Sequence, residues 1–487
     1  MKTKIENIDE LKSVLSNKEK TVSSIEHFMQ PFNLGRTLKN YSNIKQKGFS
    51  FTDVLVRLCT IQVLGMSIYQ ATREQISRLV LCGEKCVYYR LMENPLINWR
   101  GIYTRIVLRY YQIVADRSRC EGTKIIRCFV IDDTLLEKTG KCIEGITKVF
   151  DHVTRRSVLG LKMLVLGYWD GFNFVALDAS LHNETGESGK EGLTAKEQRR
   201  QHKASRDKDS FGAKRKKELT QSKIDTAVQM LQRASGLGLC ADYLVADSWF
   251  TCMEIIKVVL KLFKGKVHPL GMIVSNRHKF TYKGKPITTS GLIILLERKS
   301  SHYSRKFKCK YIEAMVDYEG IRFKIFLVRQ GGKGKYKALL TTDTQLNFTQ
   351  MMDIYKIRWS IEVFFKECKQ YLMLGKSQST NFDSRIASIT ITMIIHTVLT
   401  LEKRFNAYET MGELFKNSQK QLLELTLRKR LDTLIVAIFG LLLDLLEIDF
   451  EKLMERISNN NRYEQQYPAI IHSLQDMLLD KSVKISA

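Results

Sequence analysis

The rest of the chain is interpreted around residues 347–372, NFTQMMDIYKIRWSIEVFFKECKQYL. Its pattern predicts one uninterrupted helix, because Asn347 and Gln350 form a capping box at its start and neither Pro nor Gly occurs in it before Gly375. At about 100° per residue, a small set of polar side chains shares an arc of roughly 60° on this helix. The set is Tyr355, Arg358, Glu362 and Lys369, with Lys366 beside it.

Two interpretations of this polar face remain open from the residues alone. Glu362 with Arg358 and Lys366 could be an ordinary series of i,i+4 ion pairs on a solvated face. However, the other faces carry Ile354, Ile361, Phe364 and further apolar residues and are expected to be buried. Charges next to a buried face cost free energy unless they are paired or bind a ligand. A carboxylate surrounded by cations favours a metal ligand beside a phosphate backbone.

The pattern Y-x2-R-x3-E-x6-K, with Trp359 after the arginine, resembles the signature of the DDE transposases of bacterial insertion sequences, in the group named for YREK. The resemblance implies an α/β fold with a ribonuclease H-like catalytic core and a β-strand insertion. It also implies that Glu362 is the last of three metal-binding acids, so two aspartates are expected upstream.

Composition points to a polyanionic partner. The chain has 487 residues, 44% apolar, with a net charge of +27 and an isoelectric point near 9.6, which favours nucleic acid over an anionic membrane surface. No apolar run reaches the ~18 residues of a membrane span, and MKTKIENIDE lacks the apolar segment of a signal peptide. The ten cysteines are expected to be reduced thiols of a cytosolic protein. The resemblance implies a bacterial cytoplasm and association with the nucleoid.

Residues 1–118 are predicted to be helical. The segment from Gln70 to Ile102 has the shape of a helix–turn–helix with Gly83 in the turn. An ordinary helical bundle explains the same periodicity equally well, and the helical DNA-binding region of similar transposases favours DNA. The aromatic and cationic side chains suited to DNA are Tyr88, Tyr89, Arg90, Trp99 and Arg100.

The first acid is expected at the end of a buried strand. IIRCFVIDDT, residues 125–134, is an apolar run that ends in two aspartates. The family motif of an acid, any residue, then Ser or Thr selects Asp132, followed by Thr134. Asp133 remains an alternative, and an aspartate that merely caps a strand is common.

The second acid is predicted at Asp247. DYLVADSWFT, residues 242–251, has a strand, an acid and then a helix, which is how a ribonuclease H-like core presents its second carboxylate. Residues 266–345 alternate like β-hairpins and are rich in Lys and aromatics, which matches the β insertion that this transposase group carries.

The remaining segments complete the predicted organisation. The core is expected in residues 119–265 and 346–376, followed by a helical region, 377–487, with buried helices at 386–401 and 434–446. Residues 196–223 hold eleven Lys or Arg against four acids, typical of either a solvated loop or a mobile loop that clamps DNA.

The resemblance implies a DNA transposase that moves an insertion sequence by cut-and-paste. Asp132, Asp247 and Glu362 would bind two Mg²⁺ or Mn²⁺ ions, which prefer oxygen ligands. Tyr355, Arg358, Lys366 and Lys369 would hold phosphates, and Trp359 would stack on a displaced base. The expected partners are double-stranded DNA, as element ends and target, and a second copy of the chain. The alternatives are a catalytically silent DNA-binding derivative and a site-specific nuclease.

Overall fold

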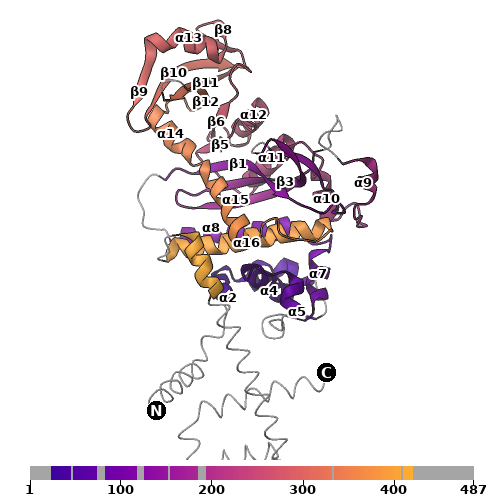
Figure 1. The fold of residues 1–487 in the computed structure, drawn as a ribbon. Helices are drawn as coiled ribbons and strands as arrows, with labels where there is room; N and C mark the ends of the chain where they lie inside the picture. Colours follow the sequence, from indigo (N-terminus) through magenta and orange to yellow (C-terminus); the bar gives the residue numbers. More distant parts are fainter. Residues whose placement is uncertain are drawn as a thin grey trace, which may run out of the picture.

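A computed structural model of the chain describes residues 24–44, 48–73, 83–117, 125–151, 154–184, 193–331, 334–406 and 410–420. Figure 1 shows a group of N-terminal helices, a mixed sheet next to two long helices, and a β-rich tip at the opposite end. The N-terminal elements are α2 (Ser24–Met29), η2 (Gln30–Phe32), α3 (Leu34–Thr37), η3 (Lys39–Ile44), α4 (Phe51–Val63), α5 (Ile68–Arg73), α7 (Lys85–Met92) and α8 (Trp99–Arg117).

Strand β1 (Cys128–Glu137), the strand predicted ahead of the first acid, lies between β3 and β5 in the sheet. Because β1 runs on to Glu137, the prediction that Asp132 lies at the end of the strand is wrong. On one side of it lie the antiparallel strands β3 (Arg156–Trp169), β2 (Thr147–Asp151) and β4 (Phe174–His182). On the other side β5 (Tyr243–Ala246) and β6 (His268–Ile273) run parallel to β1. The first four residues of β1 are fully buried, as a continuous apolar run requires when helices cover both faces.

The sheet continues from β6 into the β-rich tip. There β12 (Lys337–Thr341) pairs antiparallel with β6, followed by β11 (Ile321–Gln330) and β10 (Cys309–Tyr318). The tip buries its own apolar core, which includes Leu292 and Phe323. Strand β6 falls inside the predicted insertion, yet its parallel pairing with β5 makes it a continuation of the central strands. The other elements are β7 (Phe280–Tyr282), β8 (Lys285–Ile287), α13 (Thr289–Ser300) and β9 (Ser301–Ser304).

Helix α16 (Phe382–Phe405) is the buried helix predicted around residues 386–401. It lies next to α8 in one layer, with β4 on one side of it and α4 on the other, as Figure 1 shows. Its length and composition would suit a membrane span, but 94% of the apolar window is buried inside the fold. His396 in it is 3% exposed, with Nε2 3.1 Å from Glu367 Oε2, so the prediction of a satisfied core histidine is confirmed. The predicted helix at 434–446 lies outside the described residues.

The prediction of one uninterrupted helix over residues 347–372 is wrong. The structure has α14 (Phe348–Lys356) and α15 (Trp359–Tyr371), although the capping box of Asn347 and Gln350 is confirmed. Between the two helices, the N–H groups of Ile357 and Arg358 donate to carbonyls three residues back instead of four. The chain thus tightens into a turn of 3-10 type, and no Gly or Pro signals it.

Part of the predicted DNA-reading surface is in the protein core. Tyr88 is fully buried and Trp99 is 3% exposed, so these rings pack against the N-terminal helices and cannot reach DNA. Tyr89 is half-buried and Arg90 is exposed. Much of the first helix of the proposed helix–turn–helix lies outside the described residues.

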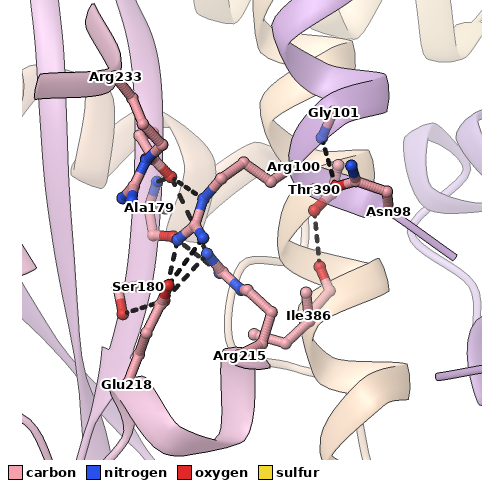
Figure 2. A network of polar contacts seen from close by, with 11 residues as sticks. Asn98, Arg100, Gly101, Ala179, Ser180, Arg215, Glu218, Arg233, Ile386 and Thr390 are labelled. Atoms are coloured by element: carbon pink, nitrogen blue, oxygen red, sulfur yellow. Dashed lines mark hydrogen bonds and ion pairs between the residues drawn. The ribbon is translucent and has the colours of Figure 1, made fainter. Parts of the chain in front are cut away.

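Arg100 is also committed to the fold, in the buried ion network of Figure 2. Its Nε donates to Asp178 at 2.8 Å, and its terminal nitrogens donate to both oxygens of Glu218 at 2.7 and 2.9 Å. Arg233 Nε donates to Asp178 at 2.7 Å, and Arg215 lies 3.2 Å from Glu218. Burial would raise the pKa of Asp178, but the three guanidinium groups outweigh it and lower that pKa to about 2. The network joins α8 to β4 and to the helices that follow it.

The basic run 196–223 is partly helical, so the prediction of one loop over its whole length is wrong. It contains most of α9 (Ala195–Arg199), all of α10 (Phe211–Glu218) and the first residue of α11 (Lys223–Gly236). Arg206, only 7% exposed, bonds to Glu144 and Asp383. These carboxylates come from distant parts of the sequence, so local composition could not reveal the pairing. Lysines 203, 208, 214 and 217 remain exposed.

Candidate active site

Two acids meet where adjacent parallel strands lead to the same edge of the sheet. Ile131 of β1 pairs with Ala246 of β5, so Asp132 and Asp247, which follow them, are neighbours across the two strands. The turn that follows Asp247 fixes its side chain, because Asp247 Oδ1 accepts hydrogen bonds from the N–H groups of Trp249 at 3.0 Å and Phe250 at 3.1 Å. The sheet therefore sets both carboxylates side by side.

Gly271 on β6 allows this turn to approach the sheet. A Cβ atom there would lie 1.9 Å from Thr251 Oγ1, and Thr251 Oγ1 donates to the carbonyl oxygen of Asp247. A side chain at position 271 would therefore push against the turn that carries the second acid.

Arg358 links the third acid, Glu362, to Asp132. One terminal nitrogen of Arg358 donates to Asp132 Oδ2 at 3.0 Å, and the other donates to Glu362 Oε1 at 2.5 Å. The structure thus brings Asp132 and Glu362 together on opposite sides of one guanidinium. The turn between α14 and α15 places Arg358 at the start of α15, one helical turn before Glu362.

The two candidate first acids point in different directions. Successive side chains of a strand face opposite sides of the sheet, and here Asp132 meets Arg358 whereas Asp133 Oδ2 accepts from Lys223 of α11 at 2.5 Å. Of the two, Asp132 therefore shares the side of Glu362. Its role as a metal ligand stays a prediction.

Negative charge outweighs positive charge around Asp132, as the pKa of this carboxyl indicates. Burial raises the pKa of Asp132 to about 7, and the charge of Asp247 adds to this, while the N–H of Asp133 and the Arg358 guanidinium oppose it. Burial also raises the pKa of the Tyr355 phenol; Arg358 opposes this shift and Asp247 adds to it. Tyr355 therefore belongs to the same cluster of charges.

The carboxylates fit a hard divalent cation by their donor chemistry, since Mg²⁺ and Mn²⁺ bind few protein oxygens and keep water or phosphate in the other positions. In the described part of the chain, no three His, Cys, Asp or Glu residues are close enough together to hold a metal ion. Arg358 is the cation between Asp132 and Glu362. The guanidinium supplies positive charge between these two half-buried acids.

The other predicted site residues spread along α15. Lys369 Nζ donates to Thr134 Oγ1 at 2.7 Å, on the Asp132 side of β1, and Lys366 is exposed. Beside Lys369 lies a cavity of about 570 Å³ whose lining includes Asp133, Thr134, Glu137, Asp151 and Lys162. The row of side chains from Tyr355 to Lys369 thus leads from the acids to this cavity.

Trp359 is 61% exposed, but it faces a different hollow. It lines a cavity of about 450 Å³ together with Trp169, Phe172, Glu367 and His396. None of the three acids is in that lining. Trp359 therefore lines a cavity that none of the three acids lines, and its stacking role stays a prediction.

The sequence analysis missed two residues next to the acids, Lys223 and Trp249. Lys223 Nζ lies 5.3 Å from the centre of the Trp249 ring while it pairs with Asp133. The position of Trp249, two residues after Asp247, was a signal that could have identified it. Lys223 was counted only as part of a basic run.

Models of two protein families match the chain across this site. Residues 98–260 match a DDE superfamily endonuclease, and residues 215–398 match a transposase DDE domain. The first range contains Asp132 and Asp247, and the second contains Asp247 and Glu362. No curated protein matches the chain. The two matches support a transposase or endonuclease of the DDE type, and such domains imply a ribonuclease H-like core for the mixed sheet.

Proposed function

We propose that this chain is a DNA transposase of the DDE type, in the YREK group of bacterial insertion sequences, and that it acts in the cytoplasm. One observation carries the proposal: Asp132 on β1 and Asp247 after β5 each follow a residue that pairs across these adjacent parallel strands, and Glu362 shares the guanidinium of Arg358 with Asp132. The two family matches overlap in residues 215–260, around the middle acid. The reaction is cut-and-paste movement, which consists of strand cleavage at the element ends and strand transfer into target DNA.

The three carboxylates would hold two Mg²⁺ or Mn²⁺ ions. When bound, such ions activate a water or a DNA 3′-hydroxyl as nucleophile and stabilise the leaving oxygen. Asp132, Asp247 and Glu362 supply the oxygen ligands, and the polar turn after β5 fixes the orientation of Asp247.

Arg358 changes partners in this mechanism. In the protein alone it is bound to Asp132 and Glu362; with DNA bound, its two-pronged guanidinium holds the scissile phosphate. Tyr355 donates a hydrogen bond to the same strand, and Lys366 and Lys369 attract the flanking phosphates. Two copies of the chain bring the element ends together. The net charge of +27 implies that DNA affinity falls steeply between 50 and 200 mM salt.

A metal-dependent nicking assay tests the proposal. Supercoiled plasmid is incubated with Mg²⁺ or Mn²⁺, and wild type is compared with Glu362→Gln and with Asp353→Asn, an exposed carboxylate of α14 paired with Lys306. We expect nicking by wild type and Asp353→Asn and none by Glu362→Gln. Nicking by Glu362→Gln at the wild-type rate would overturn the assignment.

A site-specific nuclease is the second candidate, because one matching family model describes an endonuclease. Paired DNA ends taken from the sequences flanking the coding region separate the two. A transposase joins their 3′-ends to a target plasmid, whereas a nuclease only cuts them. A catalytically silent DNA-binding derivative would bind the ends and do neither.

A further inference from the structure

We infer that helix α13 contacts duplex DNA away from the cleaved bond and bends it, with Ile294 inserted between two base pairs. The inference rests on the proposed function and adds to it a DNA contact that does not involve the acids. Ile294 is 81% exposed and its neighbour Leu295 is 45% exposed. Both lie on α13, which Figure 1 shows at the far end of the β-rich tip from β1.

Helix α13 is apolar on two faces. Leu292 and Leu296 are 0% and 8% exposed and belong to the core of the tip. At about 100° per residue, Ile294 lies roughly 200° from Leu292 and so points away from that core. A helix that is apolar all round is normally buried, and in the described part of the chain nothing covers Ile294. The outer face of α13 therefore indicates an interaction surface.

The charge around the outer face of α13 favours DNA as its partner. Residues 289–312, which include α13 and β9, hold six Lys or Arg against one acid. Arg298 and Lys299 are exposed, one helical turn after the two apolar side chains. Cations next to an apolar group fit a duplex, because phosphates attract the cations and an opened base step accepts the apolar group.

The one acid of this segment is already paired inside the tip. Glu297 Oε1 lies 2.9 Å from Arg329 Nη1 and accepts a hydrogen bond from the Tyr336 hydroxyl at 3.2 Å. Two α13 faces brought together from two copies of the chain would therefore place basic groups against basic groups. Like charges across an interface oppose association, so a polyanion fits this face better than a second copy of it.

Helix α13 is fixed at both ends. At its start, Thr288 Oγ1 accepts the Gly291 N–H at 3.2 Å. Asn276 Oδ1 accepts the Ser290 N–H at 3.0 Å, which ties the helix to the segment after β6. At its end, the chain passes directly into β9, which pairs with β10. A side chain on a helix held in this way can keep a duplex bent.

Insertion of an apolar side chain partly unstacks one base step and bends the duplex by about 20–90°. The deformation costs least at flexible pyrimidine–purine steps. The contact should therefore prefer deformable DNA without reading the edges of the bases. Because α13 lies far from β1 in the tip, the bent step is outside the cleaved bond.

The test measures the bend by energy transfer between dyes at the two ends of a duplex. The duplex has about 30 base pairs, short compared with the persistence length of about 150 base pairs, and EDTA is present, so the readout does not depend on cleavage. We expect wild type and Ile294→Leu to raise the energy transfer, because leucine keeps an apolar side chain of similar size. Ile294→Ser should lose most of that rise.

Binding to intact and mismatched duplexes gives a second readout. Ile294→Ser should bind the intact duplex about tenfold more weakly, the order of magnitude for one apolar side chain left unburied. Wild type should prefer a duplex with a central mismatch, because its base step opens at lower cost, whereas Ile294→Ser should bind both duplexes equally. Arg298→Ala should lower the slope of affinity against salt by about one and keep the bend of the bound duplex.

Ile126→Ser is the matched control. Ile126 is also exposed, at 38%, but it lies just before β1 and outside the tip. We expect it to bend and bind DNA as wild type does. Melting temperatures of all these variants should agree, because the replaced side chains are exposed.

Equal energy transfer with wild type and Ile294→Ser would overturn the inference, even if Glu362-dependent nicking is intact. Dissociation of a DNA-free dimer by Ile294→Ser in sedimentation, with bending unchanged, would also overturn it and would assign the face to a second copy. Bending that depends on Ile294, together with nicking that does not depend on Glu362, would support the inference and overturn only the proposed chemistry.

Discussion

The fold contains two clusters in which arginine pairs with carboxylates, and they have opposite character. In the network of Figure 2, Asp178 and Glu218 are each 9% exposed and are neutralised by Arg100, Arg215 and Arg233. In the candidate active site, Asp132 and Glu362 are 16% and 31% exposed and share Arg358, with Asp247 beside them. The exposed fraction of Arg100 and Arg358 is the same, 20%.

The two clusters differ in their ratio of arginines to carboxylates and not in the burial of the arginine. This ratio distinguishes a structural clamp, in which arginines neutralise the acids and stabilise the fold, from a candidate reactive site. The pKa of Asp178 is lowered to about 2 despite burial, because arginines surround it. Burial and Asp247 raise the pKa of Asp132 to about 7. The first cluster stabilises its negative charge, and the second needs a further cation. Equivalent substitutions in the two clusters should therefore have different effects on stability and on nicking.

The largest effect is expected from Glu362→Gln compared with Glu218→Gln. Loss of a metal ligand removes several kcal/mol of transition-state stabilisation, so Glu362→Gln should lower Mg²⁺-dependent nicking by about 10³-fold or more at an unchanged melting temperature. Glu218→Gln should lower the melting temperature but leave the nicking rate per folded molecule near wild type. Thermal unfolding and single-turnover nicking on the same samples measure both. The comparison fails if Glu218→Gln lowers nicking as much as Glu362→Gln.

Asp178→Asn and Asp132→Asn should change stability in opposite directions. Removal of Asp178 leaves buried guanidinium groups without their acid, which costs about 3–5 kcal/mol. Removal of the Asp132 charge relieves its repulsion with Asp247, so Asp132→Asn should keep or raise the free energy of unfolding. Urea unfolding at pH 7 measures both. A destabilisation of Asp132→Asn equal to that of Asp178→Asn would show that the Arg358 cluster is also a structural clamp.

Asp178 should contribute to the acid dependence of stability, together with other carboxyls whose pKa is lowered in the fold. Its folded pKa of about 2 lies below the ordinary 3.8, so the unfolded chain binds the proton more tightly. The contribution, about 2 kcal/mol, is therefore present above pH 4 and is lost as the pH falls through 2. Melting temperatures between pH 5 and 2.5 should fall less steeply for Asp178→Asn than for wild type. Parallel curves for the two proteins would contradict this assignment.

The smallest effect is expected when arginine is replaced by lysine in each cluster. Lysine keeps the charge but cannot reach two partners at once with a planar fork. Arg358→Lys should slow nicking about tenfold, or ~1.4 kcal/mol, and leave the melting temperature unchanged. Arg100→Lys should lower the free energy of unfolding by about 1 kcal/mol with nicking intact. Equal effects of the two variants on nicking would mean that the clusters are coupled.

The local contexts of the acids could be predicted from the sequence. The apolar run before Asp132 became β1, and the strand–acid–helix pattern around Asp247 became β5 and α12 (Met253–Leu262), because such patterns depend only on neighbours in the chain. The capping box at Asn347 was confirmed for the same reason. The turn at Arg358 was not predictable, since residues 357–358 lack a helix breaker and keep helical backbone angles.

Roles that depend on distant partners were the ones that failed. Arg100, Trp99 and Tyr88 have the composition of a DNA-binding surface, but Asp178 and Glu218 bind the first and the N-terminal core encloses the other two. Arg206 appeared to lie in a solvated loop until Glu144 and Asp383 were brought to it. Composition reports which groups are present, and it cannot report whether another part of the chain already neutralises them.

The sequence alone predicted the strand that carries Asp132, the strand that precedes Asp247, the polar residues from Tyr355 to Lys369, and a charge that favours a polyanionic partner. Only the folded structure shows that Asp132 and not Asp133 faces Glu362, that Arg358 bridges these two acids, and that Trp249 is exposed beside Asp247. The physical reason is the range of the interactions. Hydrogen bonds of strands, turns and caps join residues near one another in the chain, whereas the charge state and partners of a buried group depend on everything that folding brings within a few ångströms of it.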